Sequence, residues 1–393
     1  MLQLAPPSST AGRALLFVSL AFLLLLPFSG TAALRTILLL ACLFLTLRVW
    51  LKDKPKLPPL LWVFAVWALA ALLTTVAAEN PARSFKHLKS EVGYSLLAYC
   101  TFFLAAAQAN AFVLFRRVAT LSLAILGGGA AIAALSANGK WVPGYFNELG
   151  EYNTFVITTL PLVLTALLPS SVRAGTKEQW LVAASILLAL LACFLSKSRG
   201  VWIVVTFIIV VMPLYAWRHV GQKHRLKAGL LVALIAGSGL VAAYLAGSQR
   251  GMPLLQSNSR EVIYAAAVEH IMERPLLGHG FGRTSSLAYY GTVTPQGSLI
   301  AHPHNLFLSY ADQAGIVGLL ALLLVLGAFF LRFTQAARAA RSPIFAVTGL
   351  TLMMAIVLRS MPDMFFYGQN MWLFWAHCGI LMRCLQEAND ATE

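Results

Sequence analysis

The chain carries very little charge for its length. Only 11% of its 393 residues are Asp, Glu, Lys or Arg, whereas 59% are hydrophobic. A soluble domain usually has about twice that share of charged residues, so the composition excludes an ordinary soluble enzyme. Apolar runs of the length that crosses a bilayer recur from end to end, which predicts an all-α polytopic membrane protein with about 12 transmembrane helices.

The predicted spans define three regions. Residues 1–247 hold helices 1–9 with short loops, residues 248–305 form one large polar loop, and residues 306–393 hold helices 10–12 and a short tail. Thr31-Ala32-Ala33 resembles a signal-peptide cleavage site, but the long first run and the spans that follow predict that it is retained. The spans are 14–30, 34–51, 58–77, 93–112, 117–136, 154–171, 178–196, 201–217, 228–247, 306–331, 344–361 and 369–386.

Several kinds of chemical motif are missing. The five cysteines all lie in apolar runs without a CxxC pair, and the chain contains no DxD motif. Gly278-His279-Gly280-Phe281-Gly282 is no dinucleotide fingerprint, because no strand precedes it. It is either a glycine-rich turn, with His279 as a loop histidine, or a backbone nest for an anion. We therefore expect no disulfide, no metal and no cofactor.

The formal charge of +15 has a topological explanation. Lys and Arg concentrate in alternate short loops, as they do on the cytoplasmic side of membrane proteins. With 12 spans, both termini lie on that side, and a nucleic-acid partner is not needed to explain the charge. The basic loop residues are Arg48, Lys52, Lys54, Lys56, Arg116, Arg117, Arg173, Lys177, Arg218, Lys223, Arg225, Lys227, Arg332, Arg338, Arg341 and Arg383.

The opposite face then holds the segments 78–92, 137–153 and 248–305. The last contains a predicted helix with Ser259 as its N-cap. An apolar face of Val262, Ala266, Ile271 and Met272 follows, and Arg274-Pro275 ends the helix because a residue before proline avoids the α region.

Two histidines and an amide, His302, His304 and Asn305, stand where this polar loop meets the span 306–331. Polar groups at a membrane boundary are costly and usually functional. His304 is a candidate general base or hydrogen-bond donor to a reacting oxygen. The alternative is an interfacial histidine bonded to its neighbours. His302 is two residues away and does not share a helical face with His304.

Three arginines lie outside the topological pattern. Arg199 and Arg260 each present a planar guanidinium that suits a phosphate, or each is an interfacial arginine that reaches toward headgroups. For Arg359, an ion pair with Asp363 is the structural alternative.

These residues resemble a known family. His304-Asn305, nine residues and Gly315-x-x-Gly318 resemble the H-[NSQ]-x9-G-x-x-G pattern of lipopolysaccharide O-antigen ligases, and Ser198-Arg199-Gly200-x-Trp202 is similar to an S-R-G-x-W element of the same superfamily. Arg260 and the segment from Glu273 to Gly282 resemble its large periplasmic loop. The motifs lie between about residues 190 and 320, and the first half of the chain matches only as a series of spans.

The resemblance implies a GT-C-type glycosyltransferase in the bacterial inner membrane that acts at the periplasmic face. The donor would be a glycan on undecaprenyl pyrophosphate, and the acceptor a sugar hydroxyl of lipid A–core, joined with inversion. Catalytic roles would fall to His304, Arg199 and Arg260. The surrounding membrane lipids would be further partners. The implied substrate-binding residues are Arg83, Lys86, Lys89, Asn305, His302 and Arg359, of which the basic outer-loop residues Arg83, Lys86 and Lys89 would hold lipid phosphates.

Several alternatives stay open. Glu148, Glu151 or Asp363 is an alternative base. An O-antigen polymerase of the same superfamily would use similar arginines. A protein O-oligosaccharyltransferase shares the histidine motif but usually has a further periplasmic domain. A non-enzymatic transporter of lipid-linked glycan would place ionisable residues in mid-span.

Overall fold

The computed structural model describes residues 9–136, 149–170, 172–195, 198–217, 237, 258–283, 285–286, 288–290, 302–339, 343–362, 364 and 366–390. Within these ranges all regular structure is helical. The helices are α1 (Thr10–Leu25), α2 (Ala32–Asp53), α3 (Leu61–Val76), α4 (Pro81–Leu88), η1 (Lys89–Gly93), α5 (Tyr94–Ala105), α6 (Ala111–Ser136), α7 (Leu149–Leu164), α8 (Thr176–Leu195), α9 (Arg199–Trp217), α11 (Asn258–Glu273), α13 (Leu306–Arg338), α14 (Pro343–Ser360) and α15 (Gly368–Asp390).

The predicted class of polytopic membrane protein is confirmed. Five of the described helices, α2, α6, α8, α13 and α14, are long and apolar enough to cross a membrane, and α1, α3 and α9 are shorter apolar helices. Each predicted span falls on a described helix except 228–247, which lies outside the described residues apart from Gly237. The count of 12 spans and the three-region division stay predictions.

An aromatic cluster joins four of the long helices. Phe64 of α3 packs edge-on against Trp375 of α15 at 4.8 Å, and Phe329 of α13 packs against Trp375 at 5.0 Å and Tyr99 of α5 at 5.2 Å. Each such pair adds about 0.5–1.5 kcal/mol beyond the buried area. Gly379 lets α15 approach α5, because a Cβ there would lie 2.5 Å from the Tyr99 carbonyl oxygen. Small residues permit this close approach between membrane helices.

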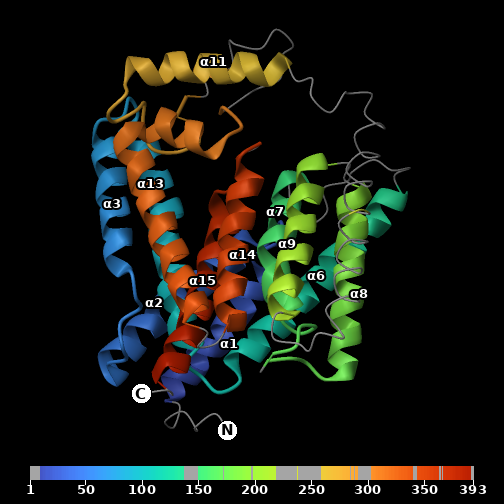
Figure 1. Cartoon of the computed structure of the whole chain (residues 1–393). Coiled ribbons are helices and arrows are strands. Elements are labelled where there is room, and N and C mark those ends of the chain that lie inside the picture. The colour runs from blue at the N-terminus through green and yellow to red at the C-terminus, as the bar shows by residue number, and fades with distance from the viewer. Residues whose placement is uncertain are drawn as a thin grey trace.

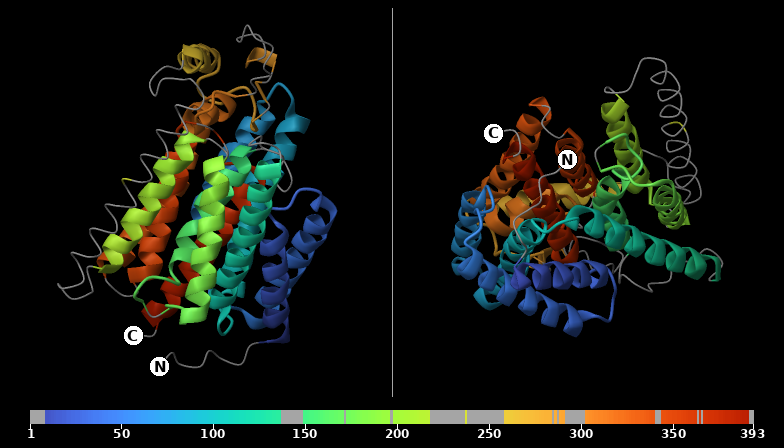
Figure 2. Two further views of the ribbon diagram at one scale, coloured as in Figure 1. Left: turned by 90° about the vertical axis from the view of Figure 1, so that its right-hand side faces the viewer. Right: turned by 90° about the horizontal axis from the view of Figure 1, so that it is seen from below.

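The start of α1 and the end of α15 lie at the same end of the bundle, here called the terminal end (Figure 2). Lys56, after α2, pairs with Asp390 at the end of α15 at 2.9 Å. Arg116 of α6 pairs with Glu178 of α8 at 2.8 Å. Tyr215 near the end of α9 donates to the carbonyl of Ala337 near the end of α13 at 3.3 Å. The basic loops that are described therefore share one side, as their alternation along the chain predicted.

Helix α11 lies across the opposite end, here called the α11 end, roughly perpendicular to the long helices (Figure 1). Its buried residues are Ile263, Ala266, Ala267 and His270, which recur at the spacing of one helical face. The predicted apolar face was right for Ala266 but wrong for Val262 and Met272, which are exposed. Ser259 is also not the cap, since α11 begins at Asn258.

The chain enters α5 at the α11 end through two short helices, which occupy the segment 78–92 that was predicted to lie on the outer face. Asn80 caps α4 by accepting the Arg83 N–H at 3.0 Å, and Pro81 occupies the first turn. The π-helical turn η1 follows and leads into α5. Single π-helical turns are rare and occur frequently at functional sites.

Candidate active site

Asn305 fixes the start of α13 at the α11 end. Its side-chain oxygen accepts the N–H groups of Phe307 at 2.9 Å and Leu308 at 3.1 Å, as an N-cap does. Its Nδ2 donates to the carbonyl of Met361, just beyond α14, at 2.9 Å. Asn305 therefore satisfies the first turn of α13 and ties that turn to the end of α14.

His304 stands directly before this cap in a left-handed conformation, with φ of 52°. This region is uncommon for a residue with a side chain, and such conformations concentrate at functional sites. The His304 N–H donates to Nδ1 of His302 at 3.1 Å, and the two rings lie 4.5 Å apart. From helical periodicity, His302 and His304 were not expected to share a face. Both residues precede the helix, however, and the turn brings their rings together. His302 is buried and His304 half-buried.

The start of α9 lies beside the turn formed by His302, His304 and Asn305, here called the corner. A Cβ built on Gly200 would lie 3.6 Å from Cγ of Pro362, and Pro362 follows the Met361 that binds Asn305. Arg199 is the first residue of α9, and its side chain lies outside the description. Arg359 is buried in the last turn of α14. Asp363, its predicted partner, is outside the described residues.

Helix α13 is interrupted at Gly315, where φ is 61° and ψ is −165°. In a continuous helix, Ile316 and Val317 would donate to the carbonyls of Asp312 and Gln313. Here Ile316 N–H donates to Pro275 at 2.9 Å and Val317 N–H to Leu276 at 3.3 Å. The segment after α11 supplies the missing partners.

The two carbonyls freed by this break are satisfied by the same segment. His279 N–H donates to the carbonyl of Asp312 at 3.0 Å, and Gly280 N–H to that of Gln313 at 2.9 Å. Residues 275–280 thus insert into the break of α13, and the exchange leaves all four backbone groups bonded, as buried backbone requires. The glycine-rich sequence is therefore a turn whose amides bond to α13, rather than a nest that is free to bind an anion.

Glycine is required on both sides of this insertion. A Cβ on Gly315 would lie 2.2 Å from the Leu276 oxygen, and one on Gly278 would lie 2.5 Å from the Gln313 carbonyl. Both glycines also have positive φ. The spacing of glycines in these two motifs thus has a structural reason, which is close backbone contact.

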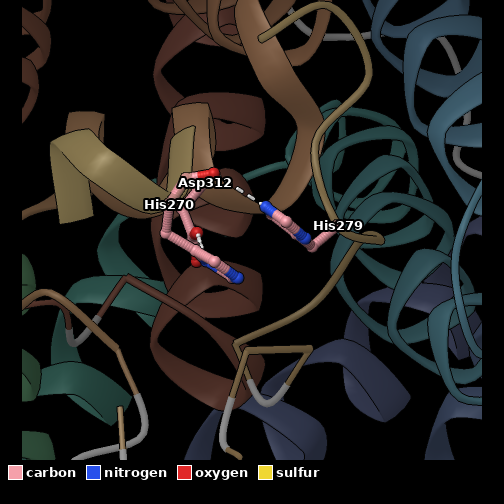
Figure 3. A group of neighbouring side chains, drawn as sticks. All are labelled: His270, His279 and Asp312. Carbon is pink, nitrogen blue, oxygen red and sulfur yellow. Dashed lines mark hydrogen bonds and ion pairs between the residues drawn. The ribbon is translucent and has the colours of Figure 1, made fainter. Parts of the chain in front are cut away.

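A buried cluster links α11 to α13 just before the break, and Figure 3 shows its members His270, His279 and Asp312. His270 Nδ1 lies 2.6 Å from the Asp312 carboxylate, and His279 Nε2 donates to the His270 carbonyl at 2.8 Å. The His270 ring is stacked between those of His279 at 3.5 Å and Tyr289 at 3.9 Å. His279 lies in a loop, as expected, and is buried there.

Two further contacts complete the surroundings of this cluster. Nδ1 of His279 lies 3.6 Å from Glu79, which also pairs with Arg274 at 3.3 Å. Burial raises the pKa of the Tyr289 hydroxyl, and Glu269, Glu273 and Asp312 raise it further. Burial, with Asp312, also raises the pKa of Tyr290. Both phenols therefore stay neutral at physiological pH.

The cluster contains metal-ligating groups whose nearest atoms all lie within 4.8 Å of one another. A metal lies near the plane of each imidazole that binds it, but these two rings are parallel to within 5° and separated by 3.5 Å. One ion therefore does not fit both planes unless a ring rotates. His270 is also already bonded to the carboxylate, so the arrangement suits a hydrogen-bonded link between helices better than a metal centre.

Buried polar atoms without a partner among the described residues occur along the bundle, and several of them lie on elements that meet near the α11 end. They include Trp202 Nε1 on α9, Ser309 Oγ and Tyr310 Oη on α13, Ser360 Oγ on α14 and Glu91 Oε2 on η1. An unsatisfied buried group costs about 1–3 kcal/mol. Such groups are normally satisfied by water or by a ligand. Their elements surround the corner of His304, which marks this region as the candidate site.

The remaining predicted residues lie on separate elements. Arg260 is exposed on α11, ten residues before His270 and therefore about 15 Å from it along the helix axis. Arg83 and Lys86 are exposed on α4, and Lys89 is exposed on η1. The structure thus brings together His302, His304, Asn305 and the start of α9, whereas Arg260 belongs to the overlying helix.

Sequence reasoning missed three buried residues: His270, Asp312 and Glu91. Positions 263, 266, 267 and 270 recur at helical spacing, so choosing this face of α11 as the buried one would have predicted that His270 is buried. No spacing rule joins His270 to Asp312, because they are 42 residues apart.

The fold and this corner define a helical membrane protein with a cluster of polar residues at the α11 end. Residues 184–323 match a family model described as O-antigen ligase. These residues include the start of α9, α11, the inserted segment and the break of α13, which are the elements described above.

The chain is also similar to a Pseudomonas aeruginosa protein named "O-antigen ligase". The two are 33% identical over 98 residues, which cover 24% of this chain and 22% of that protein. The matched stretch is therefore about a fifth of the relative. Together the two comparisons confirm the resemblance to the O-antigen ligase family that the motifs predicted.

Proposed function

We propose that the protein is an O-antigen ligase that transfers a glycan from undecaprenyl pyrophosphate to a sugar hydroxyl of lipid A–core. The observation that carries this proposal is His304, held in a left-handed conformation between His302 and the Asn305 cap. A positioned imidazole at the end of a bundle suits proton abstraction from an acceptor hydroxyl. The family match over residues 184–323 supports the reaction class.

In this mechanism His304 accepts the proton of the acceptor hydroxyl as its oxygen attacks the anomeric carbon. The bond from that carbon to the pyrophosphate oxygen breaks, and the configuration inverts. His302 and Asn305 hold the turn that carries the base, and Arg359 completes the surrounding polar wall. The Glu151 carboxylate accepts from the hydroxyl of Tyr367, just before α15, at 3.3 Å, which favours His304 as base.

The departing pyrophosphate needs positive charge. Arg199 begins α9, and the start of a helix itself favours an anion. Arg260 projects from the exposed part of α11, the helix that lies across the same end of the bundle. Arg83, Lys86 and Lys89 form an exposed basic group for lipid phosphates. Guanidinium groups then replace the metal used by DxD glycosyltransferases.

The proposed orientation follows from the basic loops at the terminal end, which would face the cytoplasm with both termini. The α11 end then faces the periplasm, and the enzyme is of the GT-C type in the bacterial inner membrane. Its partners are the lipid-linked glycan, the lipid A–core and the surrounding lipids.

Lipopolysaccharide from a deletion strain tests the proposal and separates ligase from polymerase. Loss of a ligase leaves bare core, and long glycan accumulates on the lipid carrier. Loss of a polymerase instead leaves core capped with a single repeat unit. Unchanged banding would contradict both activities.

A further inference from the structure

A buried carboxylate lies on the π-helical turn that precedes α5. Glu91 is only 2% exposed. Its Oε1 lies 3.4 Å from Nδ1 of His87, one turn earlier. Its Oε2 is buried and has no hydrogen-bond partner among the described residues. One oxygen of this carboxylate is therefore paired with His87, and the other lacks a donor among the described residues.

A buried phenol on α13 faces the same region. Tyr310 is fully buried, and its hydroxyl has no partner in the described part of the chain. Tyr310 lies five residues beyond the Asn305 cap, about 7.5 Å along the axis of α13. It is thus close to the turn that carries His304.

The inserted segment bridges the two groups. The Phe281 ring packs edge-on against Tyr310 at 6.1 Å. The next residue, Gly282, touches His87 so closely that a Cβ there would lie 2.3 Å from the imidazole Cγ. Its N–H is fixed to the side-chain oxygen of Gln313 at 3.1 Å. Because Phe281 and Gly282 are adjacent, Tyr310 and the His87–Glu91 pair lie around one point of the chain.

We propose that Glu91 and Tyr310 form a subsite that binds the hydroxyl groups of a sugar ring. This inference rests on the proposed function and deepens it. A carboxylate accepts strong hydrogen bonds, and a phenol both donates and accepts. Neighbouring hydroxyls on a sugar offer the matching donors and acceptors. The sugar belongs either to the lipid-linked donor or to the acceptor core, and the two share this chemistry.

Kinetics of the purified full-length protein in lipid nanodiscs test the subsite, with lipid-linked glycan and core lipopolysaccharide varied separately. In Tyr310→Phe, KM for one substrate should rise about threefold to tenfold. In Glu91→Gln, it should rise about tenfold to a hundredfold, because hydrogen bonds to charged groups are stronger. The substrate whose KM rises identifies whether the sugar is that of donor or acceptor.

Tyr310→Phe is the decisive variant, because its hydroxyl makes no hydrogen bond within the described residues and its loss should leave the thermal midpoint unchanged. Tyr99→Phe is the matched control: Tyr99 is equally buried but donates to the Pro59 carbonyl at 2.6 Å. This control should lose stability and keep both KM values.

The outcomes separate the two proposals. Wild-type protein that transfers no glycan would contradict the proposed function itself. Normal wild-type transfer, with both KM values of Tyr310→Phe unchanged, would overturn the subsite alone. Glu91 Oε2 and the Tyr310 hydroxyl would then bind buried water instead of a sugar.

Discussion

His270 of α11 and Asp312 of α13 are joined by a buried contact of 2.6 Å between Nδ1 and the carboxylate. The contact lies three residues before the break at Gly315, where the segment after α11 enters α13. The two helices are therefore held both by side chains and by exchanged backbone hydrogen bonds. Since α11 carries Arg260 and α13 begins beside His304, this junction sets the relative position of two proposed catalytic residues.

Removal of either partner of this pair should destabilise the protein. Asp312→Ala leaves the His270 donor without its partner, and His270→Ala leaves a buried carboxylate without its partner. Each substitution should therefore lower the free energy of unfolding by about 1–3 kcal/mol. The double variant should cost less than the sum of the two, which thermal unfolding of all four proteins would measure. Additive losses would mean that the pair does not couple α11 to α13.

Gly315→Ala should disrupt the junction far more than a glycine replacement elsewhere in α13. The new Cβ would meet the Leu276 oxygen at 2.2 Å in a backbone conformation unsuited to alanine. The control is Gly327→Ala, which meets nothing within 4 Å and should stabilise the helix by about 0.5–1 kcal/mol. Limited proteolysis after α11 and thermal unfolding would compare them. Equal behaviour of the two variants would contradict the insertion.

His304→Ala should abolish transfer while the protein still folds. Loss of a general base costs about a hundredfold to ten-thousandfold in rate. His304→Asn should fail equally, although asparagine tolerates the left-handed conformation, so it controls for backbone strain. His302→Ala should be milder, since it removes an acceptor of the His304 N–H rather than the base. Ligation in complemented strains, with expression checked, would measure this. Near-normal ligation by His304→Asn would exclude the catalytic role.

Transfer should not require a divalent metal. The sequence has no DxD motif, and the two imidazoles of the buried cluster are stacked in a way that does not suit a shared ion. Purified protein with lipid-linked donor should therefore work in EDTA at its normal rate. Loss of activity that magnesium or manganese restores would contradict this prediction.

Lysine should not replace Arg199 or Arg260. Lysine keeps the charge but not the planar fork, so each substitution should cost about 1.5–3 kcal/mol, or roughly tenfold to a hundredfold in rate. The pyrophosphate gains charge as it leaves, and the loss should therefore appear mainly in kcat rather than in donor KM. Arginines that only reach toward lipid headgroups would be replaced by lysine without loss, and wild-type rates in both variants would support that role.

The sequence alone determined the class of protein and the grouping of its loops. The bilayer constrains both strongly, because a span needs a long apolar run and basic loops stay on one side. Local spacing was also enough to predict that His302, His304 and Asn305 stand at the start of a helix, and to reveal the family resemblance. Both depend on motifs that are contiguous in the chain.

Only the tertiary structure decided which polar residues meet. Apolar residues occur around α11 on more than one side, so docking on α13 selected Ile263, Ala266, Ala267 and His270 as the buried face. His279 became buried because the break at Gly315 exposed two carbonyls that its segment could satisfy. Glu91 and Tyr310 are more than two hundred residues apart in the sequence, and packing of η1, α13 and the inserted segment brings them to one region. Such contacts depend on the summed packing of distant helices, which no local pattern encodes.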